Sequence, residues 1–184
     1  MILAISTSSP VASLALFSPD GQCLAAAHRH APRSAGAALM EMMPSVCPTL
    51  EGVEGFIADT GPGSFTGVRV GVMMAKTWGV LRGVQVAGVP SYRLVSAQRA
   101  VVLPNKRGEW FSVLPGQQPL FVTEFPDGAV GYGPEVAEPT YPLAERCGEV
   151  WSELEWTDPM VLVPKYLVAP SISLPKSAFG APPA

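Results

Sequence analysis

Charged residues are scarce in this sequence. Lysine and arginine number 12 and aspartate and glutamate 15, so charged residues make up 15% of the 184 positions and the net charge is −3. Basic residues do not cluster, which argues against direct, tight binding of nucleic acid. Apolar residues make up 48%. This combination is typical of a soluble protein that covers part of its surface with a partner.

Long apolar runs and a cysteine framework are also missing. No run approaches the roughly 18 residues that a membrane span requires. The first residues lack the basic region of a secretory signal and read instead as a strand. The three cysteines, Cys23, Cys47 and Cys147, are an odd number without metal-ligand spacing. We therefore expect buried thiols, a cytoplasmic location and no membrane association.

Histidine is rare, which weakens every metal or protease interpretation. His28 and His30 are the only histidines, and on a strand they would share one face but lack the third ligand that a metal site needs. Asp59 precedes a glycine turn, where an aspartate is more often a turn former than a metal ligand. Ser64 or Thr66 as a nucleophile would need a base and an orienting acid, and the sequence positions neither. We predict no catalytic residue and no metal ligand.

The apolar pattern predicts an α/β fold with the element order β-β-β-α-β-α-β-α over residues 1–100. The expected strands are 2–5, 11–17, 22–29, 55–59 and 84–89. The expected helices are 34–46, 68–81 and 91–100. Ser34 caps the first and Ser91 the third, and the hydroxyls of Ser64 and Thr66 precede the second as candidate caps.

The remainder of the chain is rich in proline. Thirteen of the 20 prolines follow residue 100, and proline is excluded from helix interiors and central strands. We expect a reduced second lobe over 101–174, built of short strands and one modest helix near 143–154. Residues 175–184 are expected to form a disordered tail.

A glycine-rich block, Gly61 to Gly71, opens the second helix. Its spacing matches neither a Walker loop nor a dinucleotide fingerprint. A helix N-terminus still attracts anions, so the block is either a weak anion or nucleotide contact or a plain strand-to-helix turn. The residues of that candidate contact are Gly61, Gly63, Ser64, Thr66, Gly67 and Arg69.

Small residues recur every four positions along the same helix, at Gly67, Gly71, Ala75 and Gly79. Such a stripe lets another element approach closely; that element is either a helix of another chain or the protein's own sheet. Methionines at 40, 42, 43, 73 and 74 cannot all face one sheet, so some must face outward, where flexible thioethers suit a binding surface. The predicted interface residues are Met40, Met43, Gly71, Ala75 and Gly79.

Three blocks together resemble the TsaB family, also called YeaZ. They are residues 1–8 (MILAISTS), 61–71 (GPGSFTGVRVG, followed by Ala75 and Lys76) and 86–91 (VAGVPS). Residues 105–113 and 164–167 are similar to later segments of the family. The resemblance implies an actin/Hsp70-like, ribonuclease-H-like lobe with a truncated second lobe. The family pattern places an aspartate at the end of the first strand, where this chain has Ser6, and a hydroxyl cannot anchor a divalent cation as a carboxylate does.

The resemblance also implies a role. TsaB is a non-catalytic scaffold subunit in the synthesis of threonylcarbamoyladenosine in tRNA, and it binds the catalytic TsaD subunit, here through the first two helices. It works with the TsaE ATPase, forms a homodimer when the partner is absent and meets tRNA only indirectly. It holds no cofactor tightly, and ATP or ADP is expected only at the complex interface. The alternative is a nucleotide-binding enzyme of the same superfamily, either an ATP-dependent phosphotransferase or a metallopeptidase.

Overall fold

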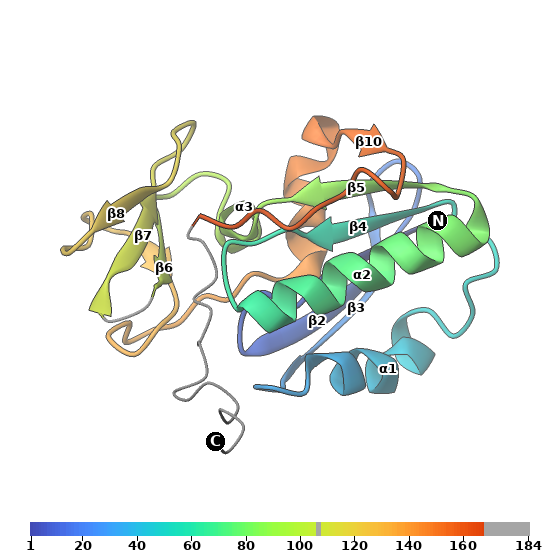
Figure 1. Ribbon diagram of the computed structural model, residues 1–184, viewed down its shortest axis with the longest axis horizontal. Coiled ribbons are helices and arrows are strands. Elements are labelled where there is room, and N and C mark those ends of the chain that lie inside the picture. Colours follow the sequence, from blue (N-terminus) through green and yellow to red (C-terminus); the bar gives the residue numbers. More distant parts are fainter. Residues whose placement is uncertain (106–107, 168–184) are drawn as a thin grey trace, which may run out of the picture.

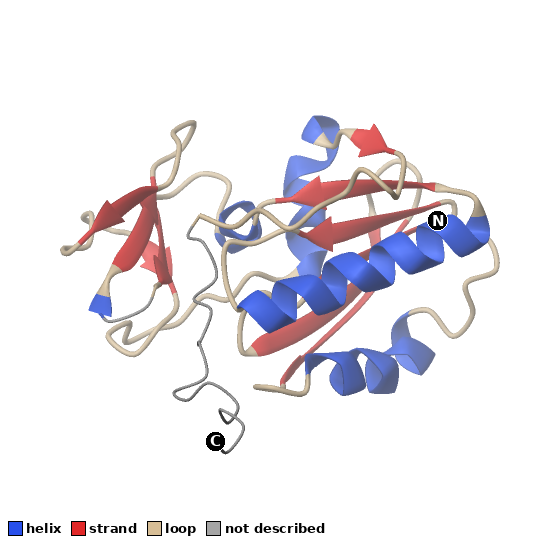
Figure 2. Ribbon diagram, in the orientation of Figure 1, coloured by secondary structure: helices blue, strands red, loops and turns tan. Residues whose placement is uncertain are grey.

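Two β-sheets organise the molecule. The computed structural model describes residues 1–105 and 108–167. A larger sheet has the strand order β10-β5-β4-β1-β2-β3, and a smaller one the order β8-β7-β6-β9 (Figure 1). Figure 2 shows that the long helices lie beside the larger sheet. This arrangement is the mixed α/β, actin-like fold that the sequence predicted.

The larger sheet begins with an antiparallel meander. Its strands are β1 (Ile2–Ser6), β2 (Val11–Phe17) and β3 (Cys23–His30). Two further strands, β4 (Gly55–Asp59) and β5 (Gln85–Val89), then run parallel to β1. β1 and β2 are buried along their whole length because helical segments cover both faces of the sheet. The predicted strands of this lobe are confirmed to within a residue or two.

Helices alternate with these strands in the predicted order. They are α1 (Ala35–Val46), α2 (Phe65–Arg82) and α3 (Ser91–Val95). The third helix was predicted to reach residue 100 but ends at Val95, because the Ser96 hydroxyl accepts the backbone N–H groups of Gln98 and Arg99 in a turn.

Only one of the predicted capping serines caps its helix through the side chain. The Ser64 hydroxyl accepts the N–H of Gly67 at the start of α2. Ser34 makes no such bond, and Ser91 instead donates its hydroxyl to the carbonyl of Pro62. Ser34 is therefore the N-cap residue of α1, as predicted, but without a capping hydroxyl bond, whereas the expected cap at Ser91 was wrong because Pro90 precedes α3.

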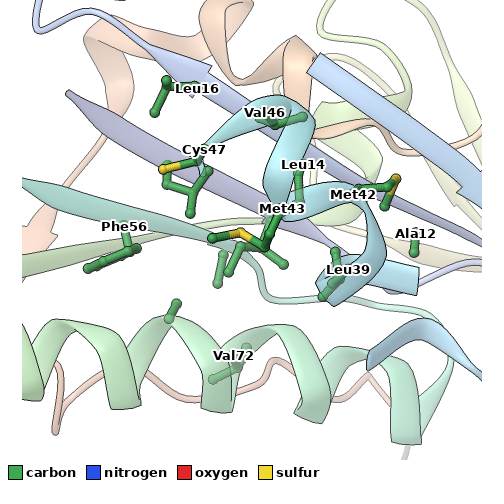
Figure 3. Close-up of a cluster of buried hydrophobic side chains, with 14 of the residues drawn as sticks. Ala12, Leu14, Leu16, Leu39, Met42, Met43, Val46, Cys47, Phe56 and Val72 are labelled. Atoms are coloured by element: carbon green, nitrogen blue, oxygen red, sulfur yellow. The ribbon is translucent and has the colours of Figure 1, made fainter. Parts of the chain in front are cut away.

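Two apolar layers pack on the larger sheet. Leu3 and Ile5 of β1 face the layer formed with α1 and α2, whereas Ile2 and Ala4 face α3 and the C-terminal helical segment. Figure 3 shows the first layer, in which Met42 and Met43 of α1 lie among core side chains. The alternation along β1 follows from the two-residue period of a strand.

The second lobe is small. Its strands are β6 (Val101–Pro104), β7 (Trp110–Val113), β8 (Leu120–Val122) and β9 (Val130–Gly131). The chain then returns to the larger sheet as a 3₁₀ segment, η2 (Ala144–Glu153), and as β10 (Trp156–Thr157), which pairs with β5. The predicted boundary of a second lobe over 101–174 was therefore wrong, because residues 144–157 belong to the first lobe. The predicted disordered tail, 175–184, lies outside the described residues.

The cysteines differ from one another in exposure. Cys47 and Cys147 are buried, whereas Cys23 is exposed on β3, contrary to the expectation of three buried thiols. Among the described helices, none has both the length and the apolar character that crossing a membrane requires.

The small-residue stripe of α2 packs on the protein itself. A Cβ atom at Gly71 would lie 2.6 Å from Thr7 Oγ1, and one at Gly79 would lie 2.8 Å from Pro159 Cγ and from Val86 Cγ1. Ala75 is completely buried. Side chains of Thr7, Val86 and Pro159 occupy the space beside this stripe. The predicted interface residues Gly71, Ala75 and Gly79 are therefore not available to another chain.

We predict that Gly71→Leu unfolds the protein at a lower temperature than the wild type. The leucine has no room beside Thr7, and overpacking of this kind costs about 1–3 kcal/mol or more. Thermal unfolding followed by circular dichroism measures the change, with Met73→Leu as control because Met73 is 56% exposed on the same helix. An unchanged melting temperature for Gly71→Leu would show that the stripe is not part of the core.

Candidate functional site

A cavity of about 640 Å³ lies where the glycine block, the β1–β2 turn and the smaller sheet meet. Its size is within the range of small-molecule sites. Its walls are mainly proline and aromatic side chains. The aromatic ones are Phe65, Phe111, Tyr132, Tyr141 and Tyr166.

Beside this cavity, the carboxylate of Asp59 is buried at the end of β4. It is only 1% exposed. Ser6 Oγ donates to its Oδ2 at 2.7 Å and Ser8 Oγ to the same atom at 2.5 Å, while the N–H of Gly61 donates to Oδ1 at 2.9 Å. Both carboxylate oxygens are therefore occupied by donors of the chain itself.

Burial dominates the electrostatics of Asp59. Desolvation raises the pKa of this carboxyl to about 6, and the hydrogen bonds from Ser8, Ser6 and Gly61 offset only part of the rise. Sequence reasoning treated Asp59 as a turn former, and its bond to Gly61 fits that interpretation. The hydrogen bonds from Ser6 and Ser8 to Asp59 were not predicted. The run of hydroxyl residues at the end of β1 was the one feature of the sequence that could have indicated them.

The glycines of the block serve a close approach within the chain. A Cβ at Gly63 would lie 2.2 Å from the carbonyl oxygen of Ser8, and a Cβ at Gly67 would lie 2.0 Å from that of Thr7. Neither contact is compatible with a side chain. The sequence left a ligand contact and a plain strand-to-helix turn as alternatives, and the β1–β2 turn occupies the space beside these two glycines.

Backbone donors of the block are also engaged. The N–H of Ser64 donates to the carbonyl of Ser8 at 2.6 Å, and the N–H of Gly67 donates to Ser64 Oγ at 3.2 Å. With the Gly61 N–H bound to Asp59, three backbone N–H groups of the block have partners in the chain. This geometry favours the strand-to-helix turn over the anion site.

The residues of the candidate anion contact do not all line the cavity. Gly63 and Ser64 line it, whereas Thr66 and Arg69 are exposed on the first turns of α2 and lie outside the cavity wall. Arg69 stacks over the ring of Phe65, with 5.1 Å between its Cζ atom and the ring centroid, and Phe65 in turn contacts Tyr166. The guanidinium is thus held on the outside of the helix.

The two histidines are exposed on the edge strand β3. Within residues 1–105 and 108–167, no three His, Cys, Asp or Glu side chains lie close enough together to hold a metal ion.

Outward-facing methionines occur on both long helices. Met40 of α1 is 58% exposed and Met73 of α2 is 56% exposed. Met43, which we expected at an interface, is buried in the core, because it lies on the side of α1 that faces the sheet. The two helices lie against each other near Gly36 and Val70, and each of them carries one exposed methionine.

Comparisons with known proteins agree with the resemblance found in the sequence. The family model for TsaD, the tRNA N6-adenosine threonylcarbamoyltransferase, matches residues 25–106. The structure is similar to that of YeaZ from Pseudomonas aeruginosa, with a TM-score of 0.69 and 20% identity over 90% of this chain and 99% of that one.

A second solved structure is an uncharacterized protein with similarity to the peptidase YeaZ from Pseudomonas aeruginosa. Its TM-score is 0.70 and its identity 18%, over 91% of this chain and 99% of that one. No curated protein matches the sequence. The chain therefore has the YeaZ fold over nearly its whole length.

Asp59 predicts a specific dependence of stability on pH. Because the folded pKa is raised, the group favours the folded state only below the unfolded pKa near 4, and stability falls as pH rises through about 6. One pKa unit is about 1.4 kcal/mol, so the loss is roughly 3 kcal/mol. Asp59→Asn should remove this fall in stability.

Denaturant titrations from pH 4 to pH 8 measure the effect. Asp127→Asn is the control, since Asp127 is exposed on the second lobe. A wild-type protein that loses no more stability over this range than Asp59→Asn would contradict the prediction.

Proposed function

We propose that this chain is a TsaB-type, non-catalytic scaffold subunit of the complex that makes threonylcarbamoyladenosine in tRNA. Its partners are a TsaD-like catalytic subunit and a TsaE-like ATPase, and it meets tRNA only through them, in the cytoplasm. The YeaZ fold and the TsaD family match support this assignment.

The observation that carries the proposal is that the polar groups beside the cavity are bonded to other parts of the same chain. In an enzyme of this fold, an acidic group and a glycine turn are free to hold a metal and phosphates. Here the Asp59 carboxylate binds Ser6 and Ser8, and the glycine block binds the β1–β2 turn. Residues that would contact a nucleotide therefore stabilise the fold, and any ATP or ADP belongs at the interface with the partner.

The docking face is the outer side of α1 and α2. Met40 and Met73 are large, flexible and exposed there, and thioethers adapt well to a partner's surface. The helices are fixed in position by the core beneath them and by the packing of the small-residue stripe. A rigid helical face of this kind can order the nucleotide-bound state of a catalytic subunit.

We predict that the double variant Met40→Glu, Met73→Glu loses binding to the TsaD-like subunit. Two buried, unpaired carboxylates at an interface cost several kcal/mol, so the dissociation constant should rise at least about a hundredfold. Isothermal titration calorimetry with the purified subunit from the same cells measures it.

Leu120→Glu is the matched control, because Leu120 is 59% exposed on the distant second lobe. It should bind like the wild type. Equal binding by the double variant and the wild type would place the partner on another face.

We also predict that the purified chain does not hydrolyse ATP, because the Asp59 carboxylate and the N–H groups of Gly61, Ser64 and Gly67 are already bound within the chain. Phosphate release is compared with a mock-purified sample and with Ser64→Ala. Turnover above the mock sample that disappears in Ser64→Ala would instead support the nucleotide-binding enzyme.

A further inference from the structure

The hydroxyl of Ser6 has two acceptors within reach. Its oxygen lies 2.7 Å from Asp59 Oδ2 and 3.0 Å from the carbonyl oxygen of Pro142. A serine hydroxyl carries one proton, and a carbonyl carries none. When Asp59 is ionised, Ser6 donates to the carboxylate, and the contact between Ser6 and Pro142 holds no hydrogen.

A protonated Asp59 removes this shortage. Ser8 Oγ lies 2.5 Å from the same Oδ2 atom, so three contacts between oxygen atoms meet here, while the two serines supply two protons. With a proton on the carboxyl, Asp59 donates to Ser6, Ser6 donates to Pro142, and Ser8 donates to Asp59. Each contact then holds one hydrogen, which is the usual condition of buried polar groups. No heavy atom has to move, because only the Ser6 hydroxyl turns.

Pro142 lies where the chain returns from the second lobe to the larger sheet (Figure 1). The ring of Tyr141, the residue before it, packs on Tyr132 of the second lobe with 5.2 Å between ring centroids. Ala144, which begins η2, is buried among side chains of the first lobe. A hydrogen bond from Ser6 to the carbonyl of Pro142 therefore fastens this return to the end of β1.

We propose that Asp59, Ser6 and Pro142 form a proton-controlled link between the two lobes. With its proton in place, Asp59 donates to Ser6, and Ser6 holds the carbonyl of Pro142. When the proton leaves to solvent, the carboxylate accepts the Ser6 hydroxyl, and the residues after Pro142 lose one of their attachments. The link concerns this cluster alone and does not rest on the proposed function.

The groups around the cluster leave Asp59 as the one that titrates. Two titratable side chains from other elements lie near it, Tyr132 of the second lobe and Cys147 of η2, and burial raises the pKa of each far above its usual value, so both stay neutral. None of the ion pairs among the described residues involves Asp59. Desolvation raises the pKa of Asp59 itself to about 6. The link is therefore made below about pH 6 and lost above it.

Amide hydrogen exchange in the full chain tests the link. The N–H of Leu143 donates to the carbonyl of Leu94 and that of Ala144 to Ser13 Oγ, so these two amides report how firmly the return is held. Their protection, relative to an unstructured amide at the same pH, should fall about fivefold between pH 5 and pH 8, the effect of one hydrogen bond. The amide of Gly83, at the C-terminal end of α2, should show no such fall.

Two variants fix the two states of the link. Asp59→Asn keeps a donor beside Ser6 at every pH, because its amide nitrogen replaces the protonated oxygen, and protection at Leu143 and Ala144 should stay at the wild type's pH 5 level. Ser6→Ala cannot bond Pro142 at any pH, so protection should stay at the pH 8 level although Asp59 still titrates. A general loss of stability on ionisation would instead leave the fall intact in Ser6→Ala.

Ser8→Ala keeps the test decisive if Ser6→Ala fails to fold. It removes a donor to the carboxylate and leaves Ser6 in place, so in measurements extended to pH 9 the fall should move to higher pH and keep its size. Constant protection in the wild type from pH 5 to pH 8 overturns the proposal. So does a fall that persists in Ser6→Ala, a fall that Ser8→Ala abolishes, or an Asp59→Asn protein whose protection lies at the pH 8 level.

Discussion

The buried carboxylate of Asp59 ties together the three segments on which the first lobe depends. Ser6 belongs to β1, Ser8 to the β1–β2 turn and Gly61 to the glycine block, and all three donate to it. An ionised group so deeply buried is costly unless it is hydrogen-bonded. The surrounding chain is therefore constrained to keep these donors in place.

This constraint explains why glycines and hydroxyl residues gather here. Once β1 and β4 are neighbours, the turn after β1 and the block after β4 emerge at the same edge of the sheet. The carbonyls of Thr7 and Ser8 come so close to Gly67 and Gly63 that no side chain fits. Sequence alone shows that the backbone is approached closely, but it does not say whether a phosphate or another part of the chain approaches it.

The first lobe was predictable because local periodicity determines it: alternating apolar residues in the meander and small or apolar residues at helical spacing in α2. Features that depend on distant partners were not. The stripe of α2 needed close packing, yet the filling of Gly79 by Pro159 depends on the return of residues 144–157 to the first sheet. Met40 and Met43 are both methionines of one helix, and only the tertiary arrangement separates the exposed one from the buried one.

The same structural role changes how variants around the cavity should be interpreted. Ser6, Ser8 and Gly63 stabilise the junction between β1 and α2, so their loss would disturb the start of α2, the helix that carries Met73. A substitution there would weaken partner binding indirectly, together with the melting temperature, and would resemble the loss of a ligand contact. Substitutions on the helical surface touch no core residue, so their effect on binding is separable from stability. Unfolding measurements are therefore needed to assign any residue of this chain to a binding surface.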